Sequence, residues 1–118
     1  MAKALGLIET HGLIGAIEAS DAAVKSAEAV LAQIEYTDPA LVTVKLRGEV
    51  ADIQAAVEAG AAAARRVGEV VSAHVIPSPD EDVEILIDHQ PEPTLTGQDA
   101  RGSAPPEETV KKKPARKK

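Results

Sequence analysis

The sequence predicts an α+β domain with the element order β-α-β-β-α-β, which is the order of ferredoxin-like folds, followed by a short C-terminal helix. Alternating apolar and polar residues mark the strands, whereas apolar residues spaced three and four apart mark the helices. A change of composition marks the end of the domain, because Pro, Gly, Ser, Thr, Gln and acidic residues dominate from residue 88 onward. We therefore expect a compact domain at residues 1–87 and a disordered, Pro-rich tail at residues 88–118.

The first half of the domain begins with a predicted strand at residues 2–10, "AKALGLIET", which ends at a His-Gly pair. Residues 13–27 then show the spacing of an amphipathic helix. Asp21 and Lys25 lie one helical turn apart, so they can form an ion pair. The buried face that this spacing predicts consists of Leu13, Ala16, Ile17, Ser20, Val24 and Ala27.

Two further strands are predicted at residues 29–37, "AVLAQIEYT", and 40–48, "ALVTVKLRG". They meet at an Asp-Pro turn, so they are expected to form a hairpin. Alternation in the second of these strands places apolar and polar residues on opposite faces, the first packed in the core and the second meeting water or an interface. The apolar face holds Val42, Val44 and Leu46, and the polar face holds Thr43, Lys45 and Arg47.

A second helix is predicted at residues 50–66, with an acidic residue near its start and two arginines at its end, as the helix dipole favours. Gly60 in its middle costs about 1 kcal/mol relative to Ala, so we expect another backbone to approach the helix there. Residues 68–77 predict the fourth strand, and residues 80–87, "DEDVEILI", predict the short acidic helix. The apolar stripe of the second helix consists of Val50, Ile53, Val57, Ala61 and Ala64.

The amino-acid composition favours an assembly over an isolated subunit. The 118 residues contain no Cys, Phe or Trp and a single Tyr, so the core has to be built from Leu, Ile, Val and Ala. Because these side chains bury little apolar area in a domain of this size, we expect a homo-oligomer. No apolar run approaches the about 20 residues that cross a bilayer, and "MAKALGLIE" is too short an apolar stretch for a signal peptide, so the expected location is the cytoplasm.

Charge is distributed unevenly along the chain. Six of the thirteen basic residues lie at positions 111–118, so residues 1–110 carry seven basic against nineteen acidic residues, a net charge of −12. The basic segment can bind a polyanion such as nucleic acid, a phospholipid surface or an acidic protein, although it lacks aromatic residues that stack on bases. It can instead serve only solubility, or fold back on the acidic domain. Its basic residues are Lys111, Lys112, Lys113, Arg116, Lys117 and Lys118.

The sequence offers little for catalysis or metal binding. His11, His74 and His89 do not have the spacing of metal ligands. A histidine inside a strand, such as His74, is expected to be a hydrogen-bonded structural residue. Glu9 and Glu18 fall on different elements, and "GLIG" after the first strand lacks the full glycine pattern of a phosphate loop. We expect no catalytic residue, no cofactor and no metal.

A combination of motifs is distributed over three segments of the chain. The segments are "ALGLIETHGLIGAIEASDAAVKSAEAVL", "LVTVKLRGEVADIQAAVEAGAAAARRVGEVVSAHVIPSP" and "DEDVEIL". Together they resemble the single-domain shell proteins of bacterial microcompartments, the class of carboxysomes and of propanediol- and ethanolamine-utilisation compartments. The resemblance covers residues 4 to about 86 and leaves the tail outside. It implies a flat, cyclic homohexamer that tiles edge to edge into a shell around enzymes.

The resemblance also implies that the loop between the second and third strands lines a narrow pore on the sixfold axis. In this sequence the loop consists of Thr37, Asp38, Pro39 and Ala40, with Tyr36 just before it. Many relatives carry a glycine-rich loop with a Ser there, whereas Pro39 removes an amide donor. If Asp38 faces the axis, six carboxylates attract cations and repel anions; if it caps the turn, the backbone and Thr37 line the opening.

The edge of the implied hexamer differs from the usual pattern. Lys25 matches the lysine that relatives place between hexamers, whereas Glu28 occupies a position that is often Asn. Relatives commonly follow "HVIP" with Arg-Pro, but this chain has Ser78 and then Asp80 beyond the proline. The edge loses a cation and gains acids, so the resemblance leaves open whether the chain tiles alone.

Two functions follow from these observations. The first is a non-enzymatic shell tile in the bacterial cytoplasm, without membrane contact, whose partners are its own copies, other shell proteins, encapsulated enzymes and the small metabolites that pass its pore. The second is a minor shell or scaffolding oligomer whose basic tail binds a polyanion, either nucleic acid or acidic cargo.

Overall fold

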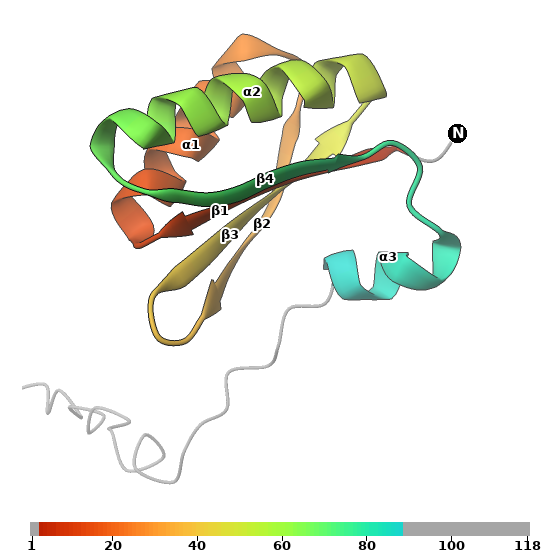
Figure 1. The fold of residues 1–118 in the computed structure, drawn as a ribbon. Coiled ribbons are helices and arrows are strands. Elements are labelled where there is room, and N and C mark those ends of the chain that lie inside the picture. Colours follow the sequence, from red (N-terminus) through yellow and green to blue (C-terminus); the bar gives the residue numbers. More distant parts are fainter. Residues whose placement is uncertain (1–2, 89–118) are drawn as a thin grey trace, which may run out of the picture.

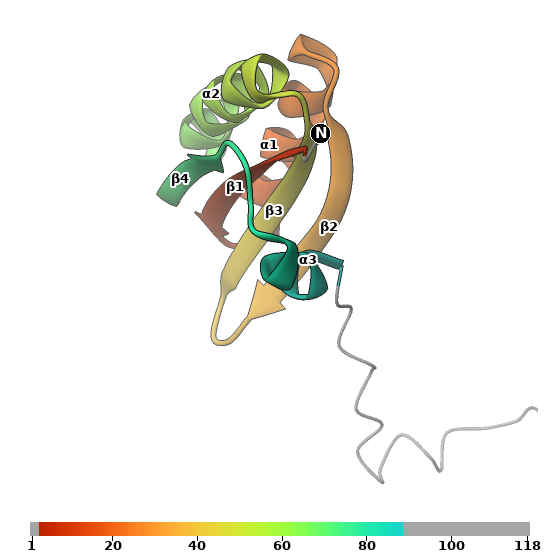
Figure 2. The ribbon, with the colours of Figure 1, turned by 90° about the vertical axis from the view of Figure 1, so that its right-hand side faces the viewer.

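The computed structural model describes residues 3–88 and shows a four-stranded sheet with two helices on one face and a third helix on the other (Figures 1 and 2). The elements are β1 (Ala4–His11), α1 (Leu13–Ser26), β2 (Val30–Thr37), β3 (Leu41–Gly48), α2 (Val50–Val67), β4 (Val70–Ile76) and α3 (Glu81–Asp88). This order confirms the predicted α+β fold, and each element begins and ends within about two residues of the predicted range. Of the predicted tail at residues 88–118, Asp88 is instead the last residue of α3, and residues 89–118 lie outside the described residues.

The strands form one antiparallel sheet in the order β2-β3-β1-β4. β1 and β3 are therefore central, and β2 and β4 form the two edges. The hairpin predicted from the Asp-Pro turn is present as the β2–β3 pair. α1 connects β1 to β2, α2 connects β3 to β4, and both helices cover the same face (Figure 1).

The core lies between this face and the two helices. β3 contributes Val42, Val44 and Leu46, which are at most 3% exposed and confirm the predicted apolar face of the strand. The buried side chains of α2 include Ile53, Val57, Ala61 and Ala64, four of the five residues in its predicted stripe.

α1 and α2 pack closely through small residues. A Cβ atom added to Gly60 of α2 would lie 2.8 Å from the carbonyl oxygen of Ala19 and 3.3 Å from the Cβ of Ala23, both on α1. The close approach expected at Gly60 is therefore confirmed. Only a helix face without large side chains can pack at this separation.

The predicted buried face of α1 is partly wrong, because the close packing against α2 requires small side chains on the buried face. Ala16 and Ser20 are buried as expected, and Ala19 and Ala23 are buried with them. The larger side chains that the spacing also placed inward are instead at the surface. The exposed fractions are 43% for Leu13, 55% for Ile17 and 41% for Val24.

Candidate functional site

The turn between β2 and β3 lies at the exposed tip of their hairpin (Figure 1). Tyr36, the only aromatic residue of the chain, is 67% exposed. Thr37, Asp38, Pro39 and Ala40 are exposed as well. The five residues predicted to line a pore are thus accessible from outside the subunit.

Backbone hydrogen bonds fix the base of this turn on both sides. The β2–β3 ladder continues to the pair formed by Thr37 and Leu41. The amide of Gly12 donates a hydrogen bond of 2.8 Å to the carbonyl oxygen of Ala40. Gly12 has a φ angle of 96°, which residues with a side chain rarely adopt, so the connection from β1 to α1 depends on glycine here.

The residues predicted at the hexamer edge are also exposed. Lys25 Nζ donates a hydrogen bond of 2.8 Å to Asp21 Oδ2, which confirms the predicted ion pair along α1. The hydrogen bond and the charge of Asp21 raise the pKa of Lys25 above its usual value. Glu28 follows α1 and precedes β2, and its side chain is exposed.

Two of the predicted edge residues lie between β4 and α3. Ser78 and Asp80 are both exposed. Asp80 Oδ1 accepts a hydrogen bond of 2.9 Å from the amide of Asp82, so this carboxylate caps the N-terminus of α3. The local sequence could have indicated this cap, because an Asp directly before a helical segment is a common start signal.

Strand pairing places these edge residues at the end of the sheet that lies away from the turn. Gly48, the last residue of β3, pairs with Ala4. A Cβ atom on Gly48 would lie 2.9 Å from the carbonyl oxygen of Glu28. Glu28 and the C-terminal end of α1 therefore lie beside the end of β3.

On the β4 side of the sheet, the predicted edge residues also lie at the end away from the turn. Ile76, the last residue of β4, pairs with Leu5 near the start of β1, and Ser78 follows two residues later. The turn ends at Ala40, directly before Leu41, which is the first residue of β3 and lies at its other end. Since an eight-residue strand is about 24 Å long, the turn and the edge residues are separated by about the length of β3.

A hollow of about 460 Å³ opens at the same end as the edge residues. Its wall carries both signs of charge: Lys3 and Arg47 contribute cations, whereas Glu28, Glu49 and Asp52 contribute carboxylates. The hollow is formed by the ends of α1 and β3 and the starts of β2 and α2. Sequence patterns did not predict it, because its lining residues come from segments far apart in the chain.

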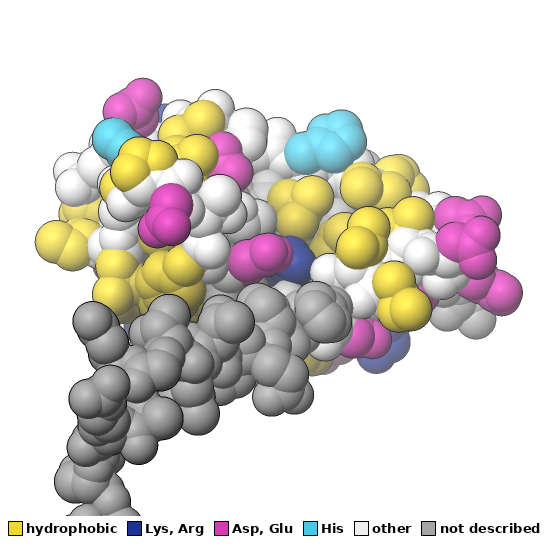
Figure 3. Space-filling model, turned by 90° about the horizontal axis from the view of Figure 1, so that it is seen from below, with side chains coloured by type: hydrophobic (Ala, Val, Ile, Leu, Met, Phe, Trp, Pro, Cys, Tyr) yellow, Lys and Arg dark blue, Asp and Glu magenta, His cyan; other side chains and the backbone are white. Residues whose placement is uncertain are grey.

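Large apolar side chains remain exposed on several elements. Figure 3 shows apolar side chains, small ones included, at the surface of one face of the molecule. Where such side chains are neighbours on one face, a contact with another protein or with a second copy of the chain would bury them. The most exposed are Ile14 and Ile17 on α1, Val30 and Tyr36 on β2, and Ile85 and Leu86 on α3.

The histidines do not converge on a site. His11 Nδ1 lies 3.8 Å from Glu69 Oε2, and both side chains are more than half exposed. His74 is exposed on the edge strand β4, not packed in the core, and His89 lies outside the described residues. Within residues 3–88, His, Asp and Glu side chains form no group of three that could hold a metal ion. None of the helices in this part of the chain has the length and apolarity to cross a membrane.

The element order and the strand order β2-β3-β1-β4 define a class, namely a small subunit with a ferredoxin-like fold. The BMC domain model matches residues 4–79. The chain is 55% identical over 85 residues to the bacterial microcompartment shell protein PduA of Citrobacter freundii, covering 72% of this chain and 91% of PduA. It is 54% identical over 82 residues to the shell protein EutM of Salmonella typhimurium, covering 70% of this chain and 85% of EutM.

A solved structure, that of a microcompartments protein from Desulfitobacterium hafniense DCB, superposes with a TM-score of 0.67 at 28% sequence identity. The match covers 80% of this chain and 52% of the other, so this chain spans about half the length of that protein. The chain belongs to the BMC-domain family of bacterial microcompartment shell proteins. The resemblance seen in the sequence is thereby confirmed.

The basic residues Lys111, Lys112, Lys113, Arg116, Lys117 and Lys118 lie outside the described residues, so their predicted binding to a polyanion stays a prediction.

Proposed function

We propose that this protein is a structural, non-enzymatic tile of a bacterial microcompartment shell. Six copies form a flat ring in which the turn from Thr37 to Ala40 faces the sixfold axis. Lys25 and Glu28, with Ser78 and Asp80, face the next ring. The other partners are further shell proteins and the encapsulated enzymes, and small metabolites cross the ring through its pore.

The observation that carries this proposal is the placement of the turn and the edge residues at opposite ends of the strands. A tile needs one end directed to its axis and the other to its perimeter, and β3 separates the two by about 24 Å. Membership of the shell-protein family supports the same arrangement.

The exposed apolar residues support assembly. Full burial of one Val, Leu or Ile side chain contributes about 1.5–3 kcal/mol. Ile14 is 73% exposed and Val30 is 61% exposed, so most of this stabilisation is still available to a contact between subunits. A ring that covers such side chains would add to the small core of each subunit.

The chemistry of the proposed pore follows from Asp38. Six carboxylates around one opening form a ring of negative charge, which favours the passage of cations and opposes that of anions. Pro39 cannot donate a backbone hydrogen bond, so the turn offers fewer donors to an anion than a glycine-rich turn would.

A cysteine introduced at Asp38 tests the position of the turn, because the natural chain has no Cys. Around a sixfold axis, neighbouring copies of a residue are as far from one another as each is from the axis. A narrow pore would therefore bring adjacent cysteines within the about 4.4–6.8 Å between Cα atoms that a disulfide needs. We expect Asp38→Cys to give covalently linked subunits under mild oxidation.

The matched control is Glu58→Cys, which places a cysteine at an exposed position on α2. It is expected to remain uncrosslinked within the assembly under the same conditions. If Asp38→Cys assembles normally but crosslinks no more than this control, the turn does not face the axis and the proposed pore is wrong.

A further inference from the structure

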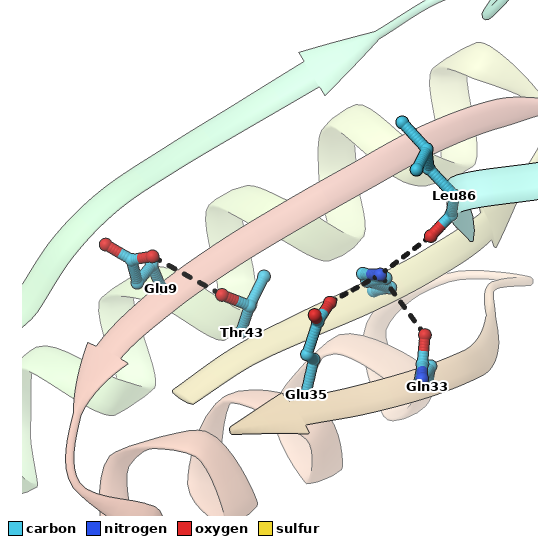
Figure 4. Close-up of polar contacts among 6 residues, drawn as sticks. Glu9, Gln33, Glu35, Thr43 and Leu86 are labelled. Atoms are coloured by element: carbon cyan, nitrogen blue, oxygen red, sulfur yellow. Dashed lines mark hydrogen bonds and ion pairs between the residues drawn. The ribbon is translucent and has the colours of Figure 1, made fainter. Parts of the chain in front are cut away.

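Lys45 is a buried cation that joins three elements of the subunit. The residue is 8% exposed, although it lies on the face of β3 opposite the helices α1 and α2. Its ammonium group lies 2.7 Å from Glu35 Oε2 and donates hydrogen bonds of 3.2 Å to Gln33 Oε1 and to the carbonyl oxygen of Leu86 (Figure 4). Because a lysine has three N–H donors, this set matches its full capacity.

Two of these acceptors belong to β2, and the third belongs to the last turn of α3. The last carbonyl groups of a helix have no partner within the helix and carry its negative dipole end, so a cation there is stabilising. Lys45 thus supplies α3 with a hydrogen bond that the helix cannot make itself.

A second cation of β3 contacts the first turn of α3. Arg47 Nη2 lies 2.7 Å from Glu84 Oε1, and the side chains are 15% and 36% exposed. Ile87 adds one apolar contact, being 3% exposed, whereas Ile85 and Leu86 point their side chains to the surface at 75% and 67% exposure. α3 has eight residues, which is too short for a stable isolated helix. Its structure therefore depends on the contacts with β3.

The same lysine reaches the base of the exposed turn. Glu35 lies two residues before Thr37, and it pairs with Thr43 on β3. If α3 leaves the sheet, Lys45 loses one of its acceptors and becomes open to water, which weakens its attraction for Glu35. The Nζ atom of Lys45 therefore contacts both Leu86 on α3 and Glu35 on β2.

We infer that α3 is a releasable strap and that its docking is energetically coupled to the order of the β2–β3 hairpin through Lys45. A partner or a change in the assembly that lifts α3 would loosen the hairpin that carries the turn, and a rearranged turn would loosen α3. The coupling rests on contacts within one chain, so its failure would leave the proposed shell function untouched.

Hydrogen exchange of the full-length protein tests the coupling. It is measured from milliseconds upward on two peptides, one covering α3 and one, the hairpin peptide, covering Gln33 to Thr37. The variant is Glu84→Ala, which removes the contact with Arg47 and leaves the hairpin residues unchanged. Ala favours helix formation more than Glu does, but Glu84 lies in the first turn of α3, where its charge also favours the helix dipole. The hairpin peptide, which the helix dipole of α3 does not reach, therefore carries the test of the coupling. We expect exchange in α3 to be faster on the order of tenfold, and exchange in the hairpin peptide to be faster by roughly threefold or more.

Asp21→Ala is the matched control, because it removes an ion pair of similar length on the exposed side of α1. It should alter neither peptide. Lys45→Met is the reciprocal variant and should accelerate exchange in both segments, since it keeps the bulk of the side chain and removes the shared cation. Faster exchange in α3 of Glu84→Ala with an unchanged hairpin would overturn the coupling, and unchanged α3 would overturn the strap.

Discussion

Gly60→Ala tests the close packing of the two helices on which the core depends. A Cβ atom at this position would lie 2.8 Å from the carbonyl oxygen of Ala19 and 2.8 Å from Ile8 Cδ1. The methyl group of Ile8 can rotate away, but the carbonyl of Ala19 belongs to the backbone of α1. The two helices would have to separate by roughly 0.6 Å or more to reach an ordinary van der Waals contact of about 3.4 Å.

The expected effect is the sum of two opposing contributions. Ala in place of Gly inside a helix stabilises by about 1 kcal/mol. Overpacking a core costs about 1–3 kcal/mol. We therefore expect Gly60→Ala to lower the free energy of unfolding by about 1 kcal/mol, within a range of about 0–2 kcal/mol.

Urea denaturation followed by far-ultraviolet circular dichroism measures this change, because the chain has no Trp to serve as a fluorescent probe. The protein concentration must be equal for all variants, since assembly shifts apparent stability. Ala62→Gly at an exposed position of the same helix is the control, and it should lose about 1 kcal/mol through helix propensity alone. A gain of about 1 kcal/mol for Gly60→Ala would refute the close approach.

Two further predictions concern the surface and the tail. Lys25→Ala should reduce the extent of two-dimensional arrays seen by electron microscopy without changing thermal stability, because its ion pair with Asp21 lies on the surface. Arg66→Ala removes another exposed cation at a helix end and should leave the arrays intact. Equal loss of arrays in both variants would argue against a specific edge contact. Removal of residues 111–118 should abolish any salt-sensitive binding to nucleic acid, as measured by fluorescence anisotropy over a range of salt concentrations. Salt-sensitive binding that survives the removal would instead assign the binding to the domain.

The sequence predicted the order and approximate bounds of all seven elements, because strands and helices differ clearly in the period of their apolar residues. It did not predict which face of α1 is buried. Apolar residues lie on two stripes of this helix. The stripe of small residues, Ala19 and Ala23 among them, is the buried one because it packs closely against Gly60 of α2. Periodicity alone cannot decide between the stripes, since the larger residues such as Ile17 are suited to a contact between subunits.

Lys45 illustrates a second reason why part of the structure could not be predicted. Alternation correctly placed it on the face opposite the core, but it is buried because α3 returns to that face from 41 residues further along the chain. Local patterns do not reveal such contacts. The candidate turn at Thr37 to Ala40 was located by its resemblance to a family, whereas hydrophobic spacing indicated only a hairpin connection.

The most direct test of the proposed shell tile is the mass of the protein in solution, measured by light scattering after size exclusion chromatography. The proposal predicts an assembly of six times the 12.2 kDa mass of one chain. A single species of 12.2 kDa at micromolar concentration would contradict it, because one copy alone forms no ring and no pore.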